Sequence, residues 1–414
     1  MEKQRPCLED KTVQIINVSQ EADYVVRAGK VFDGRALLPY EKTDIIISGG
    51  RITAVEQGAG PAPDSCKVFI DLGGCAVLPG LVDCHVHLAL DGKDFNRAMD
   101  LWPRESLLLE RIGNDLRKTL DRGIVAVRDG GDRQWVGFRA RDEVNSGRLA
   151  GPRILSPGIA LGKRGRYGSF LGPGITGDQI EDTVKKTAAR GVDHIKVLVS
   201  GVVSFKEYRR VGEMHFSPEE LGRLVWHSHR LGLRVMAHAS SDEAAALAAG
   251  AGVDSLEHGY FISRPTLEIL AKKGIPWIPT LAPVANQARG RLGEGHTPEE
   301  LEVIEKTYRR QLKMVYRAQE LGVIIGTGTD AGATGVLHGE GLLEEMLLLE
   351  EAGLGRDQIL RAATASGSLI LGLEKELGMV IPGLPPYLIA VRGNPLENLQ
   401  ALENIEYMIL PSAG

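Results

Sequence analysis

Residues 81–88 read Leu81-Val82-Asp83-Cys84-His85-Val86-His87-Leu88, an apolar run that carries two histidines one residue apart. Residues i and i+2 of a β-strand point to the same face, so His85 and His87 project side by side. Two neighbouring imidazoles at a strand end can bind one metal ion. The same alternation places Cys84 on the opposite face, where we interpret it as a packing residue. A His-x-His pair alone fits two ordinary hydrogen-bonded histidines equally well, so the remainder of the chain must decide.

The composition is that of a globular protein and excludes several classes of function. The 414 residues are 43% hydrophobic and 25% charged, which suits one large domain and a smaller one. A net charge of -5 argues against a nucleic-acid partner, and the absence of a long apolar run or signal peptide argues against a membrane. We expect a small-molecule substrate, a possible homo-oligomer and a cytoplasmic location. The last expectation rests on four cysteines without a C-x-x-C pair, Cys7, Cys66, Cys75 and Cys84.

The N-terminal part of the chain predicts a small β unit. Residues 43–48 and 51–55 flank Gly49-Gly50, which is a strong signal for a β-hairpin. Another strand is expected at 68–72. Two short strands at 387–391 and 405–409 end the chain, and we expect them to pair with the N-terminal unit. The prediction is a composite β-sandwich domain of residues 1–79 plus 380–414.

Between these ends, short apolar runs alternate with helical stretches. The eight runs are 81–88, 123–128, 152–157, 194–200, 233–239, 255–259, 275–281 and 323–329. Capping boxes at Ser217-Pro218-Glu219-Glu220 and Thr297-Pro298-Glu299-Glu300 open two helices, and further helices are expected at 341–353 and 357–373. The pattern predicts an α/β fold with a (β/α)8 TIM-barrel domain over 80–379. An open doubly wound sheet is the rival, but no Gly-rich phosphate loop follows the first run.

Candidate metal ligands fall at the ends of the predicted strands. In a (β/α)8 barrel, the active site lies at the carboxyl ends of the strands. Six side chains occupy such positions on five strands: His85, His87, Lys196, His238, His258 and Asp330. Together they predict a metal centre.

Lys196 is the most informative of the six, because it lies inside the apolar run 194–200. Burial and nearby metal ions both lower the pKa of a lysine. A neutral amine can take up carbon dioxide and form a carbamate, an anion that can bridge two metals. The alternative is a lysine that reaches the strand end or pairs with a carboxylate such as Asp193 or Glu257.

The whole pattern resembles the amidohydrolase superfamily in its two-metal form. The motifs that carry the resemblance are Pro79-Gly80-Leu81-Val82-Asp83-Cys84-His85-Val86-His87, Lys196, His238, His258 and Gly328-Thr329-Asp330. More narrowly, the chain looks like the imidazolonepropionase and prolidase-like branch, which includes Xaa-Pro and Xaa-Arg dipeptidases. Motifs of that branch are Val127-Arg128-Asp129-Gly130-Gly131, Ala150-Gly151-Pro152-Arg153, Ser255-Leu256-Glu257-His258-Gly259 and Pro279-Thr280-Leu281.

The resemblance implies a role for each ligand. His85, His87 and Asp330 would hold one metal, His238 and His258 the other, and a carboxylated Lys196 would bridge them together with a hydroxide. The donor set suits Zn²⁺, although Mn²⁺, Fe²⁺ or Co²⁺ would also fit. Asp330 would act as general base and then as general acid in the cleavage of an amide or peptide C–N bond.

The loops that would contact substrate depart from the branch. A Gly-Gly-His-Gly-like loop is replaced by residues 161–168, in which Arg166 or Tyr167 stands at the histidine position. His215 and His338 are further candidates for substrate binding because they lie in predicted loops near strand ends. The substrate could therefore be a dipeptide, an N-acyl amino acid or a cyclic amide.

Two other functions compete with a C–N hydrolase. A one-metal deaminase of this superfamily would lack the lysine and carry a Glu after the fifth-strand histidine, whereas His238 is followed by Ala239-Ser240-Ser241. A non-catalytic binding protein on a hydrolase fold would have no reason to keep all six candidate ligands.

Overall fold

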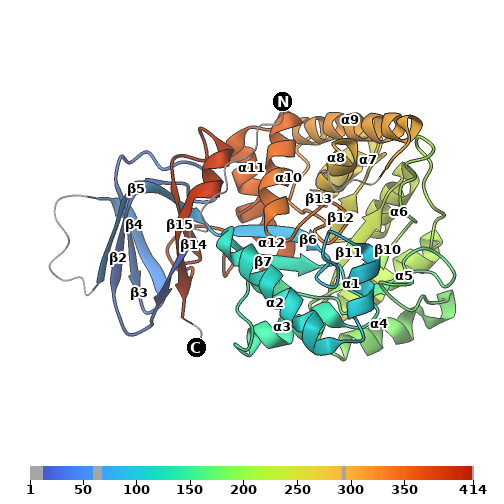
Figure 1. Ribbon diagram of the computed structural model, residues 1–414, viewed down its shortest axis with the longest axis horizontal. Coiled ribbons are helices and arrows are strands. Elements are labelled where there is room, and N and C mark those ends of the chain that lie inside the picture. The colour runs from blue at the N-terminus through green and yellow to red at the C-terminus, as the bar shows by residue number, and fades with distance from the viewer. Residues whose placement is uncertain (1–12, 59–67, 291–294, 413–414) are drawn as a thin grey trace.

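The computed structural model describes residues 13–58, 68–290 and 295–412, and shows a β-sheet at one end of the molecule beside a larger body in which helices surround parallel strands (Figure 1). Cys7 and Cys66, two of the four cysteines on which the expected location rests, lie outside the described residues. No helix in the described ranges has both the length and the apolar character needed to cross a membrane.

One seven-stranded sheet contains strands from both ends of the chain. Its order is β1-β15-β14-β5-β2-β3-β4. The strands are β1 (Gln14–Val18), β2 (Tyr24–Val31), β3 (Thr43–Ser48), β4 (Arg51–Gln57), β5 (Val68–Pro79), β14 (Leu388–Arg392) and β15 (Ile405–Pro411). The predicted hairpin is confirmed, because β3 and β4 pair antiparallel across Gly49 and Gly50, which both have positive φ.

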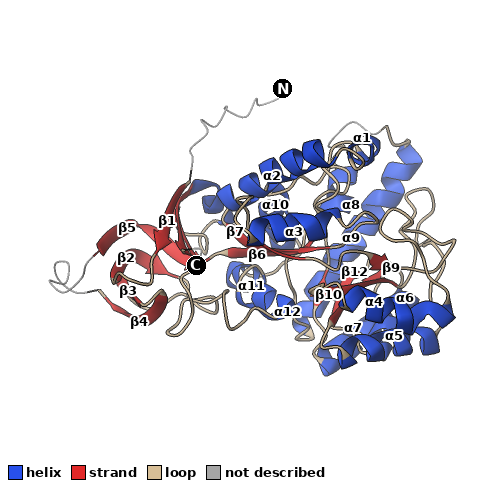
Figure 2. Ribbon diagram, turned by 90° about the horizontal axis from the view of Figure 1, so that it is seen from below, coloured by secondary structure: helices blue, strands red, loops and turns tan. Residues whose placement is uncertain are grey.

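The expected two-sheet sandwich differs from what is seen. The seven strands of this unit form a single hydrogen-bonded sheet, which curves as it runs from β1 to β4 (Figure 2). Side chains from many of its strands share one apolar cluster, including Val26, Ile45, Val77, Leu388 and Ile409. The curvature lets one sheet bury a core of its own without a second sheet against it.

The larger body contains eight short strands, which all pair in parallel. They are β6 (Leu81–Val86), β7 (Ile124–Asp129), β8 (Arg153–Leu155), β9 (Ala160–Leu161), β10 (His194–Leu198), β11 (Arg234–Ala239), β12 (Ser255–His258) and β13 (Trp277–Ile278). They form two sheets, in the orders β6-β7-β8 and β13-β12-β11-β10-β9. Seven of the eight predicted runs therefore contain strands, and β9 is an additional one. The fold is α/β with parallel sheets.

The eighth predicted run, 323–329, is not a regular strand. Trp277 donates a backbone hydrogen bond to Ile324 (2.9 Å), and Cys84 donates one to Thr327 (2.9 Å), so the segment contacts both β13 and β6 at separate points. Gly326 is in the middle of this segment, and glycine weakens the interior of a strand. A larger residue would not fit there, because a Cβ added at Gly326 would lie 2.3 Å from a side-chain carbon of Ile370. The prediction of a regular strand over 323–329 is therefore wrong, although the segment lies between β13 and β6, where the eighth strand was expected.

Helices connect and cover these strands. They are α1 (Phe95–Leu101), α2 (Glu105–Asp121), α3 (Val136–Asn145), α4 (Ile180–Ala188), α5 (Pro218–Arg230), α6 (Asp242–Ala251), α7 (Arg264–Lys273), α8 (Ala282–Ala288), α9 (Pro298–Glu320), α10 (Glu340–Glu351), α11 (Arg356–Ala362) and α12 (Ala365–Leu371), with 3-10 turns η1 (Gly177–Gln179) and η2 (Leu399–Asn404). Both predicted capping boxes are present, at the starts of α5 and α9.

The helix expected over 357–373 is divided into α11 and α12. The break follows from hydrogen bonds to the strands: the carbonyl of Ala363 accepts from the backbone N–H of Val82 (2.8 Å), where β6 begins. A carbonyl used in this way is not available to the helix ladder. The break thus fixes the strand that carries the histidine pair against α11 and α12.

Candidate metal centre

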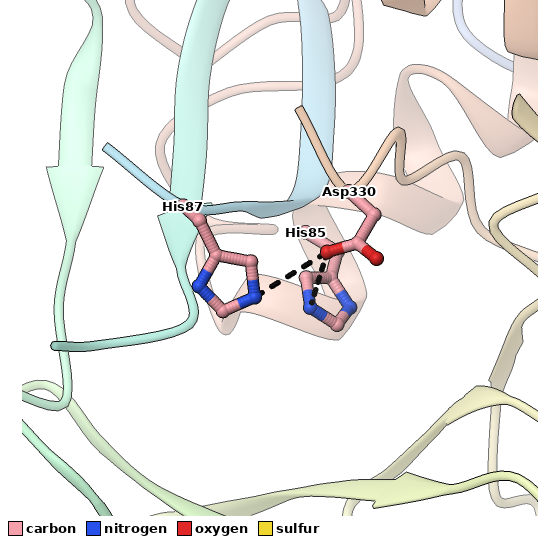
Figure 3. Close-up of side chains that lie close together, drawn as sticks. All are labelled: His85, His87 and Asp330. Atoms are coloured by element: carbon pink, nitrogen blue, oxygen red, sulfur yellow. Dashed lines mark ion pairs between the residues drawn. The ribbon is translucent and has the colours of Figure 1, made fainter. Parts of the chain in front are cut away.

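His85, His87 and Asp330 converge at the carboxyl end of β6 (Figure 3). His85 is the fifth of the six residues of β6, whose side chains are all buried, and His87 follows directly after the strand. One carboxylate oxygen of Asp330, Oδ1, lies 3.4 Å from Nε2 of His85 and 3.3 Å from Nε2 of His87. The backbone N–H of Asp330 donates to the carbonyl of His85 (2.7 Å), which ties the aspartate to the strand end.

These three donor atoms fit one metal ion. Two ligand atoms about 2.0–2.2 Å from a tetrahedral ion are roughly 3.3–3.6 Å apart, and the Asp330–histidine separations of 3.3 and 3.4 Å match that spacing. All three donor atoms lie within 4.8 Å of one another. His85 is fully buried, and the side chains of His87 and Asp330 are 12% and 14% exposed. The arrangement leaves one side of the cluster open to a ligand.

Lys196 lies directly beside this cluster. It is on β10 with 1% of its surface exposed, and its Nζ is 3.3 Å from Nε2 of His85. The two carboxylates considered as its partners have other cations: Asp193 pairs with Arg141 (2.8 Å) and Glu257 with Arg128 (2.9 Å). Burial lowers the pKa of Lys196 from 10.5 to about 8. A larger share of neutral amine is therefore present near neutral pH than for an exposed lysine.

His238 and His258 complete a group of neighbouring rings. The ring centroid of His258 lies 4.9 Å from that of His85 and 4.6 Å from that of His238. His238 is the fifth residue of β11, and His258 is the last residue of β12, so the parallel ladder brings them to the same edge as Lys196. Burial is the main cause that lowers the pKa of His238 to about 3, so its ring is neutral near pH 7.

Three of the buried histidines, His85, His238 and His258, each use one ring nitrogen in an outer hydrogen bond. Nδ1 of His85 lies 2.9 Å from Oε2 of Glu257, and Nδ1 of His258 lies 2.7 Å from Oγ1 of Thr280. Nε2 of His238 lies 3.3 Å from the carbonyl of Gly201, which can only accept. With the proton on the nitrogen that makes this bond, the other nitrogen of each ring keeps its lone pair. Outer partners of this kind orient the histidine ligands of metal sites.

Backbone strain is concentrated at the same edge. Among the described residues, five non-glycine residues have positive φ, and three of them are His258 (66°), Thr280 (46°) and Asp330 (57°). Such conformations cost about 1–3 kcal/mol each and persist where the surroundings enforce them. The surrounding structure therefore holds two candidate ligands and one outer partner in strained positions.

The charges in the cluster favour an ionised Asp330. Burial alone would raise the pKa of this carboxyl, but His85, His87 and Lys196 hold it well below its usual range. Asp83, in the same strand as His85, shows the opposite effect: burial raises its pKa to about 7, although it accepts two hydrogen bonds from Thr329. The carboxyl of Asp83 thus binds a proton more tightly than the carboxyl of Asp330 does.

A family model described as the amidohydrolase family matches residues 76–409. The chain belongs to the amidohydrolase family. The predicted resemblance, including its prolidase-like branch, is confirmed by the relatives described next.

Three relatives of this amidohydrolase illustrate the branch. An ochratoxinase from Aspergillus niger is 27% identical over 357 residues, which cover 79% of this chain and 72% of the relative. The crystal structure of a Xaa-Pro dipeptidase with bound methionine in the active site superposes with a TM-score of 0.82 and 28% identity, and covers 94% of this chain and 98% of that one. A putative prolidase from Bifidobacterium longum gives a TM-score of 0.79 and 26% identity over 94% and 93% of the two chains.

The four predicted substrate-binding residues of this amidohydrolase differ in the contacts that they make. The Tyr167 ring lies 6.0 Å from that of His238, and Arg166 next to it forms an ion pair with Glu213. His215 is buried, and its Nδ1 accepts from the backbone N–H of Lys163 (3.2 Å). Nε2 of His338 is 2.9 Å from the carbonyl of Leu90, so one of its nitrogens is already used by the backbone.

Sequence reasoning missed the roles of the outer partners, since it named Glu257 only as a possible partner of Lys196 and not of His85. Glu257 precedes His258 directly, and a carboxylate inside an apolar strand was a usable signal for a buried role. Thr280 lies in the motif Pro279-Thr280-Leu281, but that motif does not reveal that its hydroxyl lies 2.7 Å from Nδ1 of His258. Glu213 has no such signal, since its contact with Arg166 joins two loops that are far apart in sequence.

Proposed function

We propose that this amidohydrolase cleaves an amide or peptide C–N bond with the help of two divalent metal ions, Zn²⁺ being the best match to the donors. The substrate would be a dipeptide, an N-acyl amino acid or a cyclic amide. The observation that carries the proposal is the set of three buried histidines, each with one nitrogen in an outer hydrogen bond and the other available as a ligand. The similarity to a Xaa-Pro dipeptidase and to an ochratoxinase supports hydrolytic chemistry.

The ligands would divide into two groups. His85, His87 and Asp330 would hold one ion and His238 and His258 the other. Lys196, which lies beside His85, would join the two groups as a carbamate once its neutral amine has reacted with carbon dioxide. Metal ions bound here would lower the pKa of water and polarise the scissile carbonyl.

Asp330 would move the proton in this reaction. Its low pKa keeps it ionised, so it can accept a proton from the attacking water. Its carboxylate is 14% exposed, in contrast to the fully buried His85, and so it can reach a bound substrate. It would then pass the proton to the nitrogen that leaves, because an amine departs more readily than an amide anion.

We also propose that the parallel strands close into a (β/α)8 barrel. Two sets of hydrogen bonds support this closure. The 323–329 segment bonds to both β13 and β6, and the carbonyl of Ser156, just after β8, accepts from the N–H of Asp193, just before β10 (3.0 Å). Closure would bring all candidate ligands to one end of the barrel.

A substrate panel tests the proposed reaction. The purified protein, loaded with Zn²⁺ or Mn²⁺, is incubated with dipeptides, N-acetyl amino acids and cyclic amides, and released amines are measured. We expect hydrolysis of at least one class, and a loss of about 100-fold or more in the Asp330→Asn variant, which keeps the shape but not the base. Asp357→Asn, an exposed residue in the first turn of α11, is the matched control. Ammonia release from an amino-heterocycle with every C–N substrate intact would favour a deaminase instead.

A further inference from the structure

The loop between β9 and η1 and the loop after β10 face each other beside His238. The first contains a turn in which the N–H of Arg166 donates to the carbonyl of Lys163 (3.1 Å), with Gly165 at positive φ. The second is an antiparallel hairpin over residues 200–214, with bridges between Ser200 and Met214 and between Val203 and Val211. These two loops are the walls of a pocket.

The pocket between the two loops has a volume of about 230 Å³. Its lining is Gly165, Arg166, Tyr167, Gly201, Val202, Gly212 and Glu213. Two lining residues also contact His238: Tyr167 through its ring, at 6.0 Å, and Gly201 through its carbonyl, at 3.3 Å from Nε2. The pocket therefore adjoins the candidate metal ligands.

Arg166 and Glu213 are the charged groups of this pocket, and they form an ion pair across it. The side chain of Arg166 is 40% exposed and that of Glu213 is 72% exposed. An ion pair this open contributes little, because water replaces either partner at small cost. Glu213 can thus be exchanged for another carboxylate, whereas Arg166 keeps a planar fork of N–H donors that matches a carboxylate.

His215 supplies a second donor near Arg166. Its Nδ1 accepts from the backbone N–H of Lys163, so in the neutral ring the proton is on Nε2. Within the described residues, this buried Nε2 has no hydrogen-bond partner. Leaving such a donor unpaired is unfavourable, and a polar ligand atom would satisfy it. Burial, and after it the nearby Arg166 guanidinium, lowers the pKa of His215 to about 4. Burial is also the main cause that lowers the pKa of His238, with His215 as a smaller contributor.

We propose that Arg166 binds a free carboxylate of the substrate, with His215 as an additional donor, and that Glu213 occupies Arg166 until the substrate replaces it. This inference rests on the proposed function and narrows it. The substrate would carry a carboxylate close to the scissile C–N bond, as dipeptides and N-acyl amino acids do and as neutral cyclic amides do not.

Equilibrium binding gives a direct test. N-acetyl-L-leucine and N-acetyl-L-leucinamide, which differ in the carboxylate, are titrated by calorimetry into the metal-loaded Asp330→Asn variant, in which hydrolysis of the acid is suppressed. We expect the acid to bind at least tenfold more tightly than the amide. In Arg166→Gln, binding of the acid should weaken roughly 10- to 100-fold, while binding of the amide should hardly change.

Glu213→Gln should have the opposite effect. Removing the competing carboxylate should tighten binding of the acid about two- to fivefold. The matched controls are Arg164→Gln, in the same loop but outside the pocket lining and hydrogen-bonded to Gln179, and Glu207→Gln, in the same hairpin and paired with Arg210. Neither control should change binding of the acid by more than the long-range effect of removing one charge outside the pocket.

The outcomes separate this inference from the proposed function. Equal binding of acid and amide, absence of binding by both, or weaker binding in Glu213→Gln would overturn the role of Arg166. Hydrolysis of C–N substrates could still be observed in that case. Conversely, an Arg166-dependent preference for the acid without hydrolysis of any C–N substrate would leave the carboxylate site intact and refute the proposed function.

Discussion

Nδ1 of His85 lies 2.9 Å from Oε2 of Glu257, and both side chains are completely buried. The other oxygen of Glu257 accepts from Arg128 (2.9 Å) and from Ser255 (2.6 Å). The carboxylate is therefore fixed at both oxygens and can act only as an acceptor from the histidine. This relationship directs the free nitrogen of His85 toward Asp330.

Replacing Glu257 by Gln should weaken metal binding. The amide carries no charge to stabilise the protonated Nδ1, and we expect zinc affinity to fall about 10- to 100-fold. Metal content per folded protein, measured after dialysis against graded zinc concentrations, checks this. Ser255→Ala removes a neighbouring hydrogen bond without touching His85 and should retain most of the metal. An unchanged zinc affinity in Glu257→Gln would contradict the role given to this pair.

Truncating Lys196 to Ala should abolish activity, and short carboxylic acids should restore part of it. Acetate or propionate can enter the space left by the side chain and provide the anion that the carbamate would have provided. The measurement is the rate of amide hydrolysis against acid concentration, with wild type as the control that the acids should not activate. Full activity of Lys196→Ala without added acid would refute a ligand role for this residue.

Thr280→Val should impair the metal held by His258. Valine keeps the shape but loses the hydroxyl that lies 2.7 Å from Nδ1 of His258 and would accept its proton when the metal binds the other ring nitrogen. We expect about a 10-fold loss of zinc affinity at one site, with the other site little affected. Thr280→Ser retains the hydroxyl and should behave like wild type in zinc titration. Equal losses in both variants would indicate a packing effect instead.

The buried carboxyl of Glu345 should make stability depend on pH. It accepts from the backbone N–H groups of Leu281 and Ala282, and burial raises its pKa from 4.5 to about 8. The folded state therefore holds this proton more tightly than the unfolded state. The resulting contribution is fully present below about pH 4.5 and is lost as pH rises through about 8.

Urea unfolding at pH 5 and pH 8 tests this dependence. Wild type should lose more unfolding free energy between the two values than Glu345→Gln, by about 1 kcal/mol or more. The substitution also changes a backbone contact, but that cost is the same at both pH values. Parallel losses in the two proteins would show that Glu345 does not titrate in this range.

The sequence was informative where periodicity and hydrophobicity coincide. The buried run of β6 and the capping boxes of α5 and α9 were predicted because local chemistry determines them. The break between α11 and α12 was not, since it depends on the carbonyl of Ala363 bonding to Val82, a contact between distant segments. The irregular 323–329 segment was missed for a related reason, because its glycines pack against side chains that periodicity does not reveal.

The candidate site follows the same division. Residue types at strand ends were enough to select His85, His87 and Asp330, which the structure brings together. The same reasoning selected Arg166 but not its partner Glu213, because each lies in a loop whose path the sequence pattern does not specify. Residues on regular elements can be placed from sequence, whereas contacts between loops require the three-dimensional structure.

The sheet that joins both ends of the chain has a consequence for synthesis on the ribosome. β5 is made early and runs directly toward β6, but its neighbour β14 is among the last strands to emerge, and Leu388 must find Pro79 across the whole intervening chain. Until then, one edge of β5 is unpaired, and exposed strand edges promote aggregation of nascent chains. The newly made N-terminal strands would therefore be an expected binding site for chaperones until translation is complete.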